Sequence, residues 1–454
     1  MLAVVATIVS VPIIFIEVRK FIRLRKIYNF NKELRKIKMT NKPIKLLPGE
    51  ATLIGTTPSG KPIYVPDNAK HAFICGTTGS GKTIALSNFV HNAIEKDYPL
   101  LIVDGKGDFG DNSLLDITRQ FAKQKFNKSL YVINLNDPEH SAKYNPFQNT
   151  SPTTVKDMLI NMTEWSEEHY KLNTERYLQR VVTLLSKLDV KLSFNSIVKA
   201  MQTEKFMSLS KELLQREIIA KGQHQDNIEL AKASGKIAES AVARFATIAE
   251  SEVGQIFDKS GIDIYTAMKE RAVILFILNP LLYPEISPAF GRLKMIDSKK
   301  AVNKLFGDNQ RKFFIYDEIS SYASNSLLDL VNKSRSANVT CVLATQSLSD
   351  LDAISEHFKE QVIENCNNYL VLRQNSSTNA EQWAGILGTR GTMEVTYQLQ
   401  QKGFDTSETG FGSARRVREF LYHPDEIKVL QTGKGIYMSK DNHFHSKVVV
   451  NKPF

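Results

Sequence analysis

Eight residues from Gly76 to Thr83 could bind a nucleoside triphosphate. Their sequence, Gly-Thr-Thr-Gly-Ser-Gly-Lys-Thr, fits the phosphate-loop pattern G-x-x-x-x-G-K-[ST]. In such a loop the backbone N–H groups and the start of the following helix point at phosphate oxygens. Lys82 would bind the β- and γ-phosphates, and the Thr83 hydroxyl would coordinate Mg²⁺. We therefore expect ATP and Mg²⁺ to bind along the whole loop: Gly76, Thr77, Thr78, Gly79, Ser80, Gly81, Lys82 and Thr83.

Two acidic residues farther along the chain could complete a hydrolytic site. The apolar run Phe313–Tyr316 predicts a buried strand, and Asp317 and Glu318 follow it directly. Asp317 at the strand tip would hold the Mg²⁺ shell, and Glu318 would orient or deprotonate the attacking water. Because only hydrolytic members of this class need the second carboxylate, the pair indicates turnover rather than a passive nucleotide switch.

Polar residues next to two other apolar runs are further candidates. Gln346 ends the run 339–345 and could contact the γ-phosphate or the water, although an ordinary strand-end glutamine is the alternative. Arg335 precedes the same run and is a candidate arginine finger that reaches the next subunit. Such a finger raises the rate by roughly 10³ or more. The alternative is a lone surface arginine, and Arg373 after the run 369–372 is a second candidate for the finger.

The elements that must position these residues are predicted to be strands alternating with helices. The phosphate loop follows the apolar run 72–75 and precedes helix-forming residues from 84 to 90. Six other runs share the composition of buried strands: 99–104, 129–135, 272–278, 313–316, 339–345 and 369–372. This spacing predicts an α/β fold with a mainly parallel, doubly wound sheet. A small hairpin over 52–65 leads into it.

The nucleotide-binding domain is predicted in two parts, residues 49–150 and 252–454, separated by an all-α inserted domain over 151–251. The insertion has no strand-like run, few glycines and a helical period of apolar residues. Within it, residues 223–245 are polar and alanine-rich, which favours a solvated helix.

The N-terminal residues 1–18 are predicted to be a transmembrane anchor. Residues 1–16 carry no charge, although a helix of this length is slightly shorter than the ~20 residues that a bilayer favours. The basic linker 19–48 follows at once, so the positive-inside rule places the main body in the cytoplasm. A buried helix of a soluble domain is the alternative.

Most of the net charge of +11 lies in this first part of the chain. Residues 1–45 contain eleven Lys or Arg and two Glu, which leaves the rest of the chain nearly neutral. Overall charge therefore does not argue for DNA binding by the main body. The three cysteines, Cys75, Cys341 and Cys366, have no metal-type spacing and are expected to be buried, reduced thiols.

Six motifs together resemble the TraD/TraG-type coupling proteins of conjugation and type IV secretion. They are Gly76–Thr83, Asp104–Asp108, Tyr144–Phe147, Tyr316–Glu318, Ala344–Leu348 and Phe420–Ile427. The resemblance extends from about Gly49 to the end of the chain. It implies a RecA-like P-loop NTPase with an all-α domain inserted in the nucleotide-binding domain, anchored in the bacterial inner membrane and assembled as a homohexamer.

The resemblance also implies partners and residue roles. The family links a DNA–relaxase complex to the secretion channel, so the implied partners are single- or double-stranded DNA, a relaxase or secreted protein, and channel components. The family's phosphate-loop lysine falls on Lys82, its Mg²⁺ aspartate on Asp317 and its water-activating glutamate on Glu318. Its sensor glutamine falls on Gln346 and its arginine finger on Arg335. Two features depart from the family: a first membrane helix and an acidic, cargo-docking tail are missing.

These observations predict an ATPase motor that drives DNA, with attached protein, into a secretion channel. A nucleotide-switched adaptor that recruits protein substrates without moving DNA is the alternative from another class. A septal DNA pump would share the core, but it would bring a larger membrane domain and a DNA-reading winged helix. Stimulation of ATP turnover by DNA distinguishes the motor from the adaptor.

Overall fold

The computed structural model describes residues 17–26, 48–68, 70–188, 191–402 and 405–453. The predicted anchor over 1–18 lies outside these residues except for its last two positions, as does most of the 19–48 linker. Residues 17–26 form a helix. In the part of the chain that the structure describes, no helix is both long and apolar enough to cross a membrane.

The centre of the structure is a sheet of eleven strands in the order β2-β1-β13-β12-β9-β3-β8-β7-β4-β6-β5. Seven neighbouring strands of this sheet pair in parallel: β3 (His71–Cys75), β4 (Leu100–Asp104), β5 (Leu130–Asn134), β6 (Val273–Ile277), β7 (Lys312–Asp317), β8 (Val339–Thr345) and β9 (Cys366–Val371). Most of their residues are buried because helices cover both faces of the sheet, and this explains the uninterrupted apolar runs in the sequence. The predicted mainly parallel α/β sheet is confirmed.

Four strands extend the sheet beyond β9: β1 (Ala51–Thr56), β2 (Pro62–Pro66), β12 (Lys434–Ser439) and β13 (Phe444–Val450). β1 and β2 pair antiparallel and form the predicted hairpin. β1 also pairs antiparallel with β13, so the first and last described strands of the sheet are neighbours.

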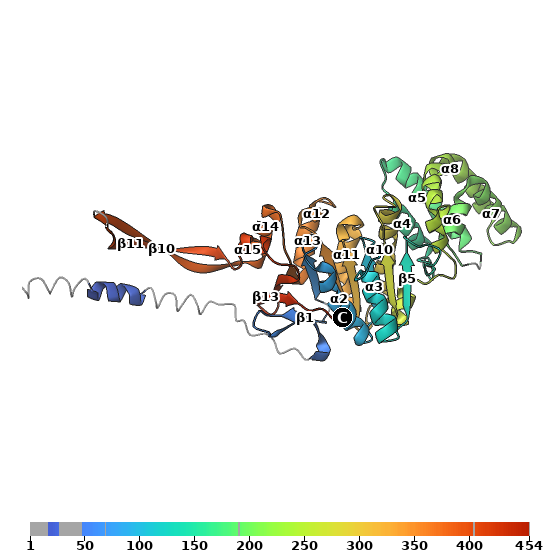
Figure 1. The fold of residues 1–454 in the computed structure, drawn as a ribbon. Helices are drawn as coiled ribbons and strands as arrows, with labels where there is room; N and C mark the ends of the chain where they lie inside the picture. The colour runs from blue at the N-terminus through green and yellow to red at the C-terminus, as the bar shows by residue number, and fades with distance from the viewer. Residues whose placement is uncertain (1–16, 27–47, 69, 189–190, 403–404, 454) are drawn as a thin grey trace, which may run out of the picture. The chain divides into compact units, whose positions relative to one another are not determined.

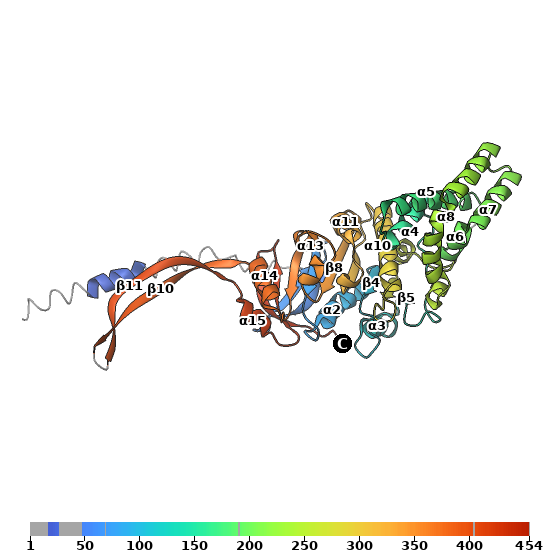
Figure 2. The same cartoon turned by 90° about the horizontal axis from the view of Figure 1, so that it is seen from above.

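Helices lie on both faces of the parallel strands. Figure 2 shows α2 (Lys82–Glu95) and α3 (Leu114–Arg119) on one face. On the other face lie α10 (Ile286–Lys304), α11 (Asn325–Ser334) and α13 (Phe358–Asn365). Each parallel pair of consecutive strands needs such a crossover, because a tight turn joins only antiparallel strands. Two short helices complete this part, α9 (Ile264–Lys269) and α12 (Ser349–Asp352).

Residues between β5 and β6 form a group of helices at the β5 end of the sheet, where α4 packs against α10 (Figure 1). Its members are α4 (Pro152–Met162), α5 (Glu168–Leu185), α6 (Phe194–Met201), α7 (Thr203–Gln215) and α8 (Lys221–Ala249). The expectation of a solvated helix over 223–245 is wrong for one face of α8. Leu230, Ala238 and Phe245 are buried on that face, which contacts α5, α6 and α7.

A second compact unit comprises the N-terminal residues, residues 373–430 and residues 438–445. It contains α14 (Ser377–Leu387), α15 (Pro424–Lys428) and a long antiparallel hairpin of β10 (Thr389–Lys402) and β11 (Asp405–Phe420). Two ion pairs, Arg390–Glu419 and Arg415–Glu394, join the strands of the hairpin near its base. The sequence had predicted a single continuous domain over 252–454, whereas the structure separates this unit from the sheet.

Candidate nucleotide-binding and hydrolysis site

The predicted phosphate loop connects the carboxyl end of β3 to the first turn of α2. Gly79 and Gly81 have φ angles of 73° and 105°, a region that side chains with a Cβ rarely adopt. A Cβ on Gly76 would lie 2.6 Å from both Leu372 Cβ and Ser80 Oγ. The three glycines of the pattern are therefore required by this backbone conformation and packing.

Backbone and side-chain contacts hold the loop in place. The Lys82 ammonium donates a hydrogen bond of 2.7 Å to the Gly76 carbonyl across the loop. The Gly433 N–H donates to the Ser80 carbonyl at 2.9 Å, and the Thr432 hydroxyl donates to the Gly79 carbonyl at 2.9 Å. The segment before β12 thus supports the phosphate loop, a contact between residues far apart in the sequence that the sequence did not predict.

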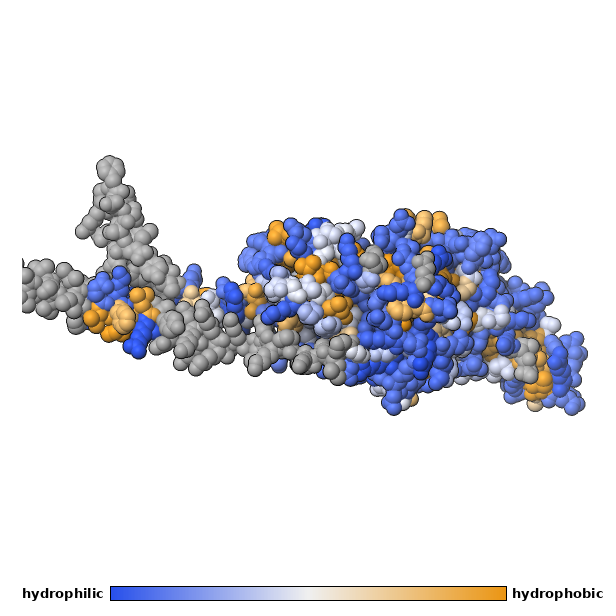
Figure 3. Space-filling model, turned by 60° about the horizontal axis from the view of Figure 1, so that its bottom comes forward, coloured by the Kyte–Doolittle hydropathy of each residue, from blue (hydrophilic) through white to orange (hydrophobic). Residues whose placement is uncertain are grey.

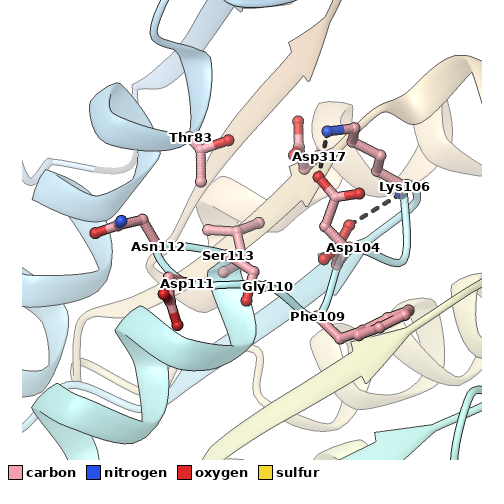
Figure 4. Close-up of a pocket in the computed structure, with 11 residues that line it drawn as sticks. Thr83, Asp104, Lys106, Phe109, Gly110, Asp111, Asn112, Ser113 and Asp317 are labelled. Carbon is pink, nitrogen blue, oxygen red and sulfur yellow. Dashed lines mark hydrogen bonds and ion pairs between the residues drawn. The ribbon is translucent and has the colours of Figure 1, made fainter.

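Oxygen donors from three elements line one cavity of about 340 Å³ beside the loop (Figure 4). They are the Thr83 hydroxyl on α2 and the carboxylates of Asp104 and Asp317. Asp104 and Asp317 end the adjacent strands β4 and β7 and are paired in register, which places their carboxylates together. Asp104 was not among the predicted site residues, although its motif after a buried strand was the available signal.

The electrostatics of these two carboxylates favour a bound cation. Burial, and then the negative charges of Asp104 and Glu318, raise the pKa of Asp317 to about 7. Burial raises the pKa of Asp104 to about 6, against the opposing effect of N–H groups from Gly107 and Lys106. A divalent cation would neutralise both groups, and Mg²⁺ prefers oxygen ligands of this kind. The residues present therefore fit Mg²⁺.

Glu318 lies next to this cavity in a strained conformation. Its φ and ψ are 48° and 53°, in the left-handed region, which costs a non-glycine residue on the order of 1 kcal/mol. Its N–H donates to Asp317 Oδ1 at 2.9 Å. The Ser320 hydroxyl donates to Glu318 Oε1 at 3.0 Å. The strain holds the acid beside Asp317 instead of letting the strand continue.

A chain of hydrogen bonds joins Glu318 to the phosphate loop. Gln346 Nε2 donates to Glu318 Oε2 at 3.1 Å, and Thr78 Oγ1 donates to Gln346 Oε1 at 3.1 Å. The geometry follows from the strand order, because β8, which precedes Gln346, lies between β3 and β7. Three predicted site residues thus meet at one point although they come from three separate motifs.

Arg335 is far from this point in the same chain. It begins the short helical turn Arg335–Ala337 that precedes β8, and it is exposed. Gln346 follows the other end of β8, so the seven-residue strand, about 23 Å long, separates the two. The structure does not bring Arg335 to its own site, and the role of a finger in a neighbouring subunit stays a prediction. The predicted buried thiols are confirmed for all three cysteines.

The family described as "Type IV secretion-system coupling protein DNA-binding domain" matches residues 56–451, most of the chain. The chain belongs to this family. Membership and the assembled loop, acidic pair and sensor glutamine identify it as a P-loop ATPase of the coupling-protein type.

Solved structures share the fold of this family member. The bacterial conjugative coupling protein TrwBdeltaN70 is 14% identical with a TM-score of 0.62, over 93% of this chain and 92% of that chain. TrwB in complex with ADP and Mg²⁺ is 15% identical with a TM-score of 0.60, over 92% of each chain. VirB4 of Thermoanaerobacter pseudethanolicus is 10% identical with a TM-score of 0.55, over 89% of this chain and 98% of that chain.

One sequence relative comes from Mycoplasma pneumoniae. It is named "Uncharacterized protein" and is 31% identical over 93 residues, which represent 17% of this chain and 78% of the relative. This match supports common ancestry of that segment and carries no functional information.

Proposed function

We propose that this coupling-family ATPase hydrolyses ATP to drive DNA, with attached protein, into a type IV secretion channel. The observation that carries the proposal is the chain from Thr78 through Gln346 to Glu318, which links the phosphate loop to a water-activating acid. A protein that only senses nucleotide does not need this acid. The family description, which names a DNA-binding domain, supports DNA as the transported polymer.

Each residue of the site has a distinct role in this reaction. Lys82 and the backbone of the phosphate loop bind the β- and γ-phosphates. Thr83, Asp317 and Asp104 would hold Mg²⁺, which neutralises charge on the phosphates. Glu318 takes a proton from, or orients, the attacking water. Its two oxygens already accept hydrogen bonds from Ser320 and Gln346, so the direction of the carboxylate is set before substrate binds.

Gln346 connects this acid to the nucleotide. Its amide is oriented, with the oxygen on Thr78 and the nitrogen on Glu318. A change at the phosphate loop would therefore move Gln346 and, through it, Glu318. This connection makes hydrolysis sensitive to whether a γ-phosphate is bound, as a motor cycle requires.

A homohexameric ring is part of the proposal. Phe109, Leu281 and Leu282 are 74%, 94% and 60% exposed on loops that follow β4 and β6, at the edge of the sheet that holds the nucleotide site. A head-to-tail interface joins two different surfaces, and it closes into a ring when the rotation allows. Arg335 lies at the opposite edge, so a neighbour in such a ring could supply it to this site.

Attachment to the bacterial inner membrane is also proposed, with residues 1–18 as the anchor and the sheet in the cytoplasm. The described helix 17–26 supports it. Val18, Phe21 and Ile22 are exposed on one side, and basic residues occupy the other, so apolar and hydrophilic surface lie side by side (Figure 3). Such a helix suits the surface of an anionic leaflet. A relaxase or secreted protein and channel components are the proposed protein partners.

The experiment measures steady-state ATP hydrolysis by the full chain in detergent, with and without single-stranded and double-stranded DNA. Lys82→Ala and Glu318→Gln serve as controls, and the oligomeric state is recorded in the same samples. DNA stimulation that disappears in both variants is expected. Turnover in assembled rings that does not respond to DNA would refute the motor and favour the adaptor that recruits protein substrates.

A further inference from the structure

The loop after β4 carries a lysine whose backbone is held on both sides. Asp104 Oδ1 accepts hydrogen bonds from the N–H groups of Lys106 at 2.9 Å and Gly107 at 3.0 Å. The Asn136 side chain donates to the Gly107 carbonyl at 3.0 Å. The backbone of Lys106 is thereby tied to the carboxylate that lines the proposed Mg²⁺ site.

The two glycines that flank Lys106 pack too closely for any other residue. A Cβ on Gly105 would lie 2.6 Å from Ser321 Oγ and 2.8 Å from the Glu318 carbonyl oxygen. Gly107 has a φ of 75°, and a Cβ there would lie 2.1 Å from the Leu278 carbonyl oxygen. The loop is wedged between the Glu318 turn and the end of β6, so Lys106 projects from a fixed position.

The side chain of Lys106 lines the same cavity as Thr83, Asp104 and Asp317 (Figure 4). Its ammonium forms an ion pair with Asp108, and the two side chains are 51% and 52% exposed. An ion pair so exposed contributes little, because water screens it and both side chains lose freedom. The ammonium can therefore exchange this carboxylate for another anion at small cost, whereas its backbone stays in place.

We propose that Lys106 is a second lysine ligand of the nucleotide, which leaves Asp108 and binds an oxygen of the terminal phosphates. It approaches the cavity from the β4 loop, whereas Lys82 reaches the phosphates from α2. A positive charge from the same subunit would then stabilise the negative charge that develops during hydrolysis. Asp108 holds Lys106 beside the cavity between turnovers. This inference rests on the proposed ATPase function and names a residue for it.

The competing explanation is structural: the Lys106–Asp108 pair only stabilises the loop. The two explanations differ in what Asp108 does. If the pair is structural, removal of either partner has the same effect. If Lys106 binds phosphate, Asp108 competes with the nucleotide, and removal of Asp108 leaves nucleotide affinity unchanged or higher.

The test measures the Kd of a fluorescent non-hydrolysable ATP analogue with Mg²⁺, and kcat for ATP, on the full chain. Lys106→Ala is expected to weaken binding of the analogue about tenfold, the value of a charge-assisted hydrogen bond, and to lower kcat as well. Lys106→Arg retains most of both, and Asp108→Asn binds at least as tightly as the unmodified chain. Circular dichroism melting checks that each variant is folded.

Two results would overturn the inference. One is an unchanged Kd and kcat in folded Lys106→Ala, and the other is an equal loss in Asp108→Asn. In both cases the ATPase proposal still stands if Lys82→Ala abolishes nucleotide binding and Glu318→Gln abolishes turnover. A full chain that binds no nucleotide would overturn the ATPase proposal and this inference together.

Discussion

The buried His71 at the start of β3 makes the stability of the sheet depend on pH. The Cys341 N–H donates to its Nδ1 at 3.0 Å, and its Nε2 lies 2.9 Å from the Val331 carbonyl oxygen. The ring is therefore neutral, with its proton on Nε2. Burial, assisted by the positive charge of Arg335, lowers the pKa of His71 from 6.5 to about 4. A proton on Nδ1 would face the Cys341 N–H and leave that donor without an acceptor.

The sign and size of the effect follow from the two pKa values. Above pH 6.5 the ring is neutral in both the folded and the unfolded chain, so His71 has no effect. Between pH 6.5 and 4 the unfolded chain binds a proton that the folded chain does not, so stability falls as the pH falls. A difference of about 2.5 pH units corresponds to about 3 kcal/mol in the free energy of unfolding.

The assay compares urea unfolding of the full chain and of His71→Gln by circular dichroism between pH 4 and 7.5. Glutamine offers a similar acceptor to Cys341 and a similar donor to Val331, and it does not titrate. The difference in unfolding free energy between the two proteins should shift by about 3 kcal/mol in favour of the variant as the pH falls. Other titrating groups are common to both and cancel. A difference that stays constant across this range would refute the reasoning.

Three further predictions test the site. Glu318→Gln should lower kcat about 10²- to 10⁴-fold with little change in the Kd for nucleotide, since it removes only the base; a comparable loss of affinity would contradict this role. Thr78→Ala should lower kcat roughly tenfold by freeing the Gln346 amide, whereas Thr78→Ser should retain activity; equal rates in the two variants would rule out the hydrogen-bonded chain. Gly107→Ala should destabilise the fold by roughly 2 kcal/mol or more in urea unfolding because of its φ of 75° and the nearby Leu278 carbonyl. Gly110→Ala, where a Cβ meets nothing within 4 Å, is the matched control and should be nearly neutral; equal effects at both glycines would disprove the packing argument.

Much of the fold could be predicted from the sequence because burial and backbone conformation leave local patterns. The central strands are covered on both faces, so each appears as an apolar run that needs no knowledge of its neighbours. The phosphate loop has glycines where the backbone requires them, at Gly79 and Gly81, and this requirement is also local. The hairpin of β1 and β2 was predicted for the same reason, from turn residues between two short runs.

Other features depend on which residues pair across space and left a weaker local signal. The polar, alanine-rich α8 did not show its buried face, because small side chains pack closely without a strong apolar stripe. The hairpin of β10 and β11 was missed, and residues 373–430 were assigned to the nucleotide-binding domain. Thr432 and Gly433 support the phosphate loop from the far end of the chain, which no local pattern records.

The sequence by itself determined the chemistry available at the site, and the tertiary structure decided how that chemistry is assembled. Lysine, threonine, two acids and a glutamine in their motifs predict a nucleotide hydrolase, because few other reactions need these groups together. The order of strands in the sheet is a global property. It puts β8 between β3 and β7, so that Gln346 bridges Thr78 and Glu318, and β4 beside β7, so that Asp104 faces Asp317. Strand order depends on the packing of the whole core, and for this reason only the tertiary structure shows it.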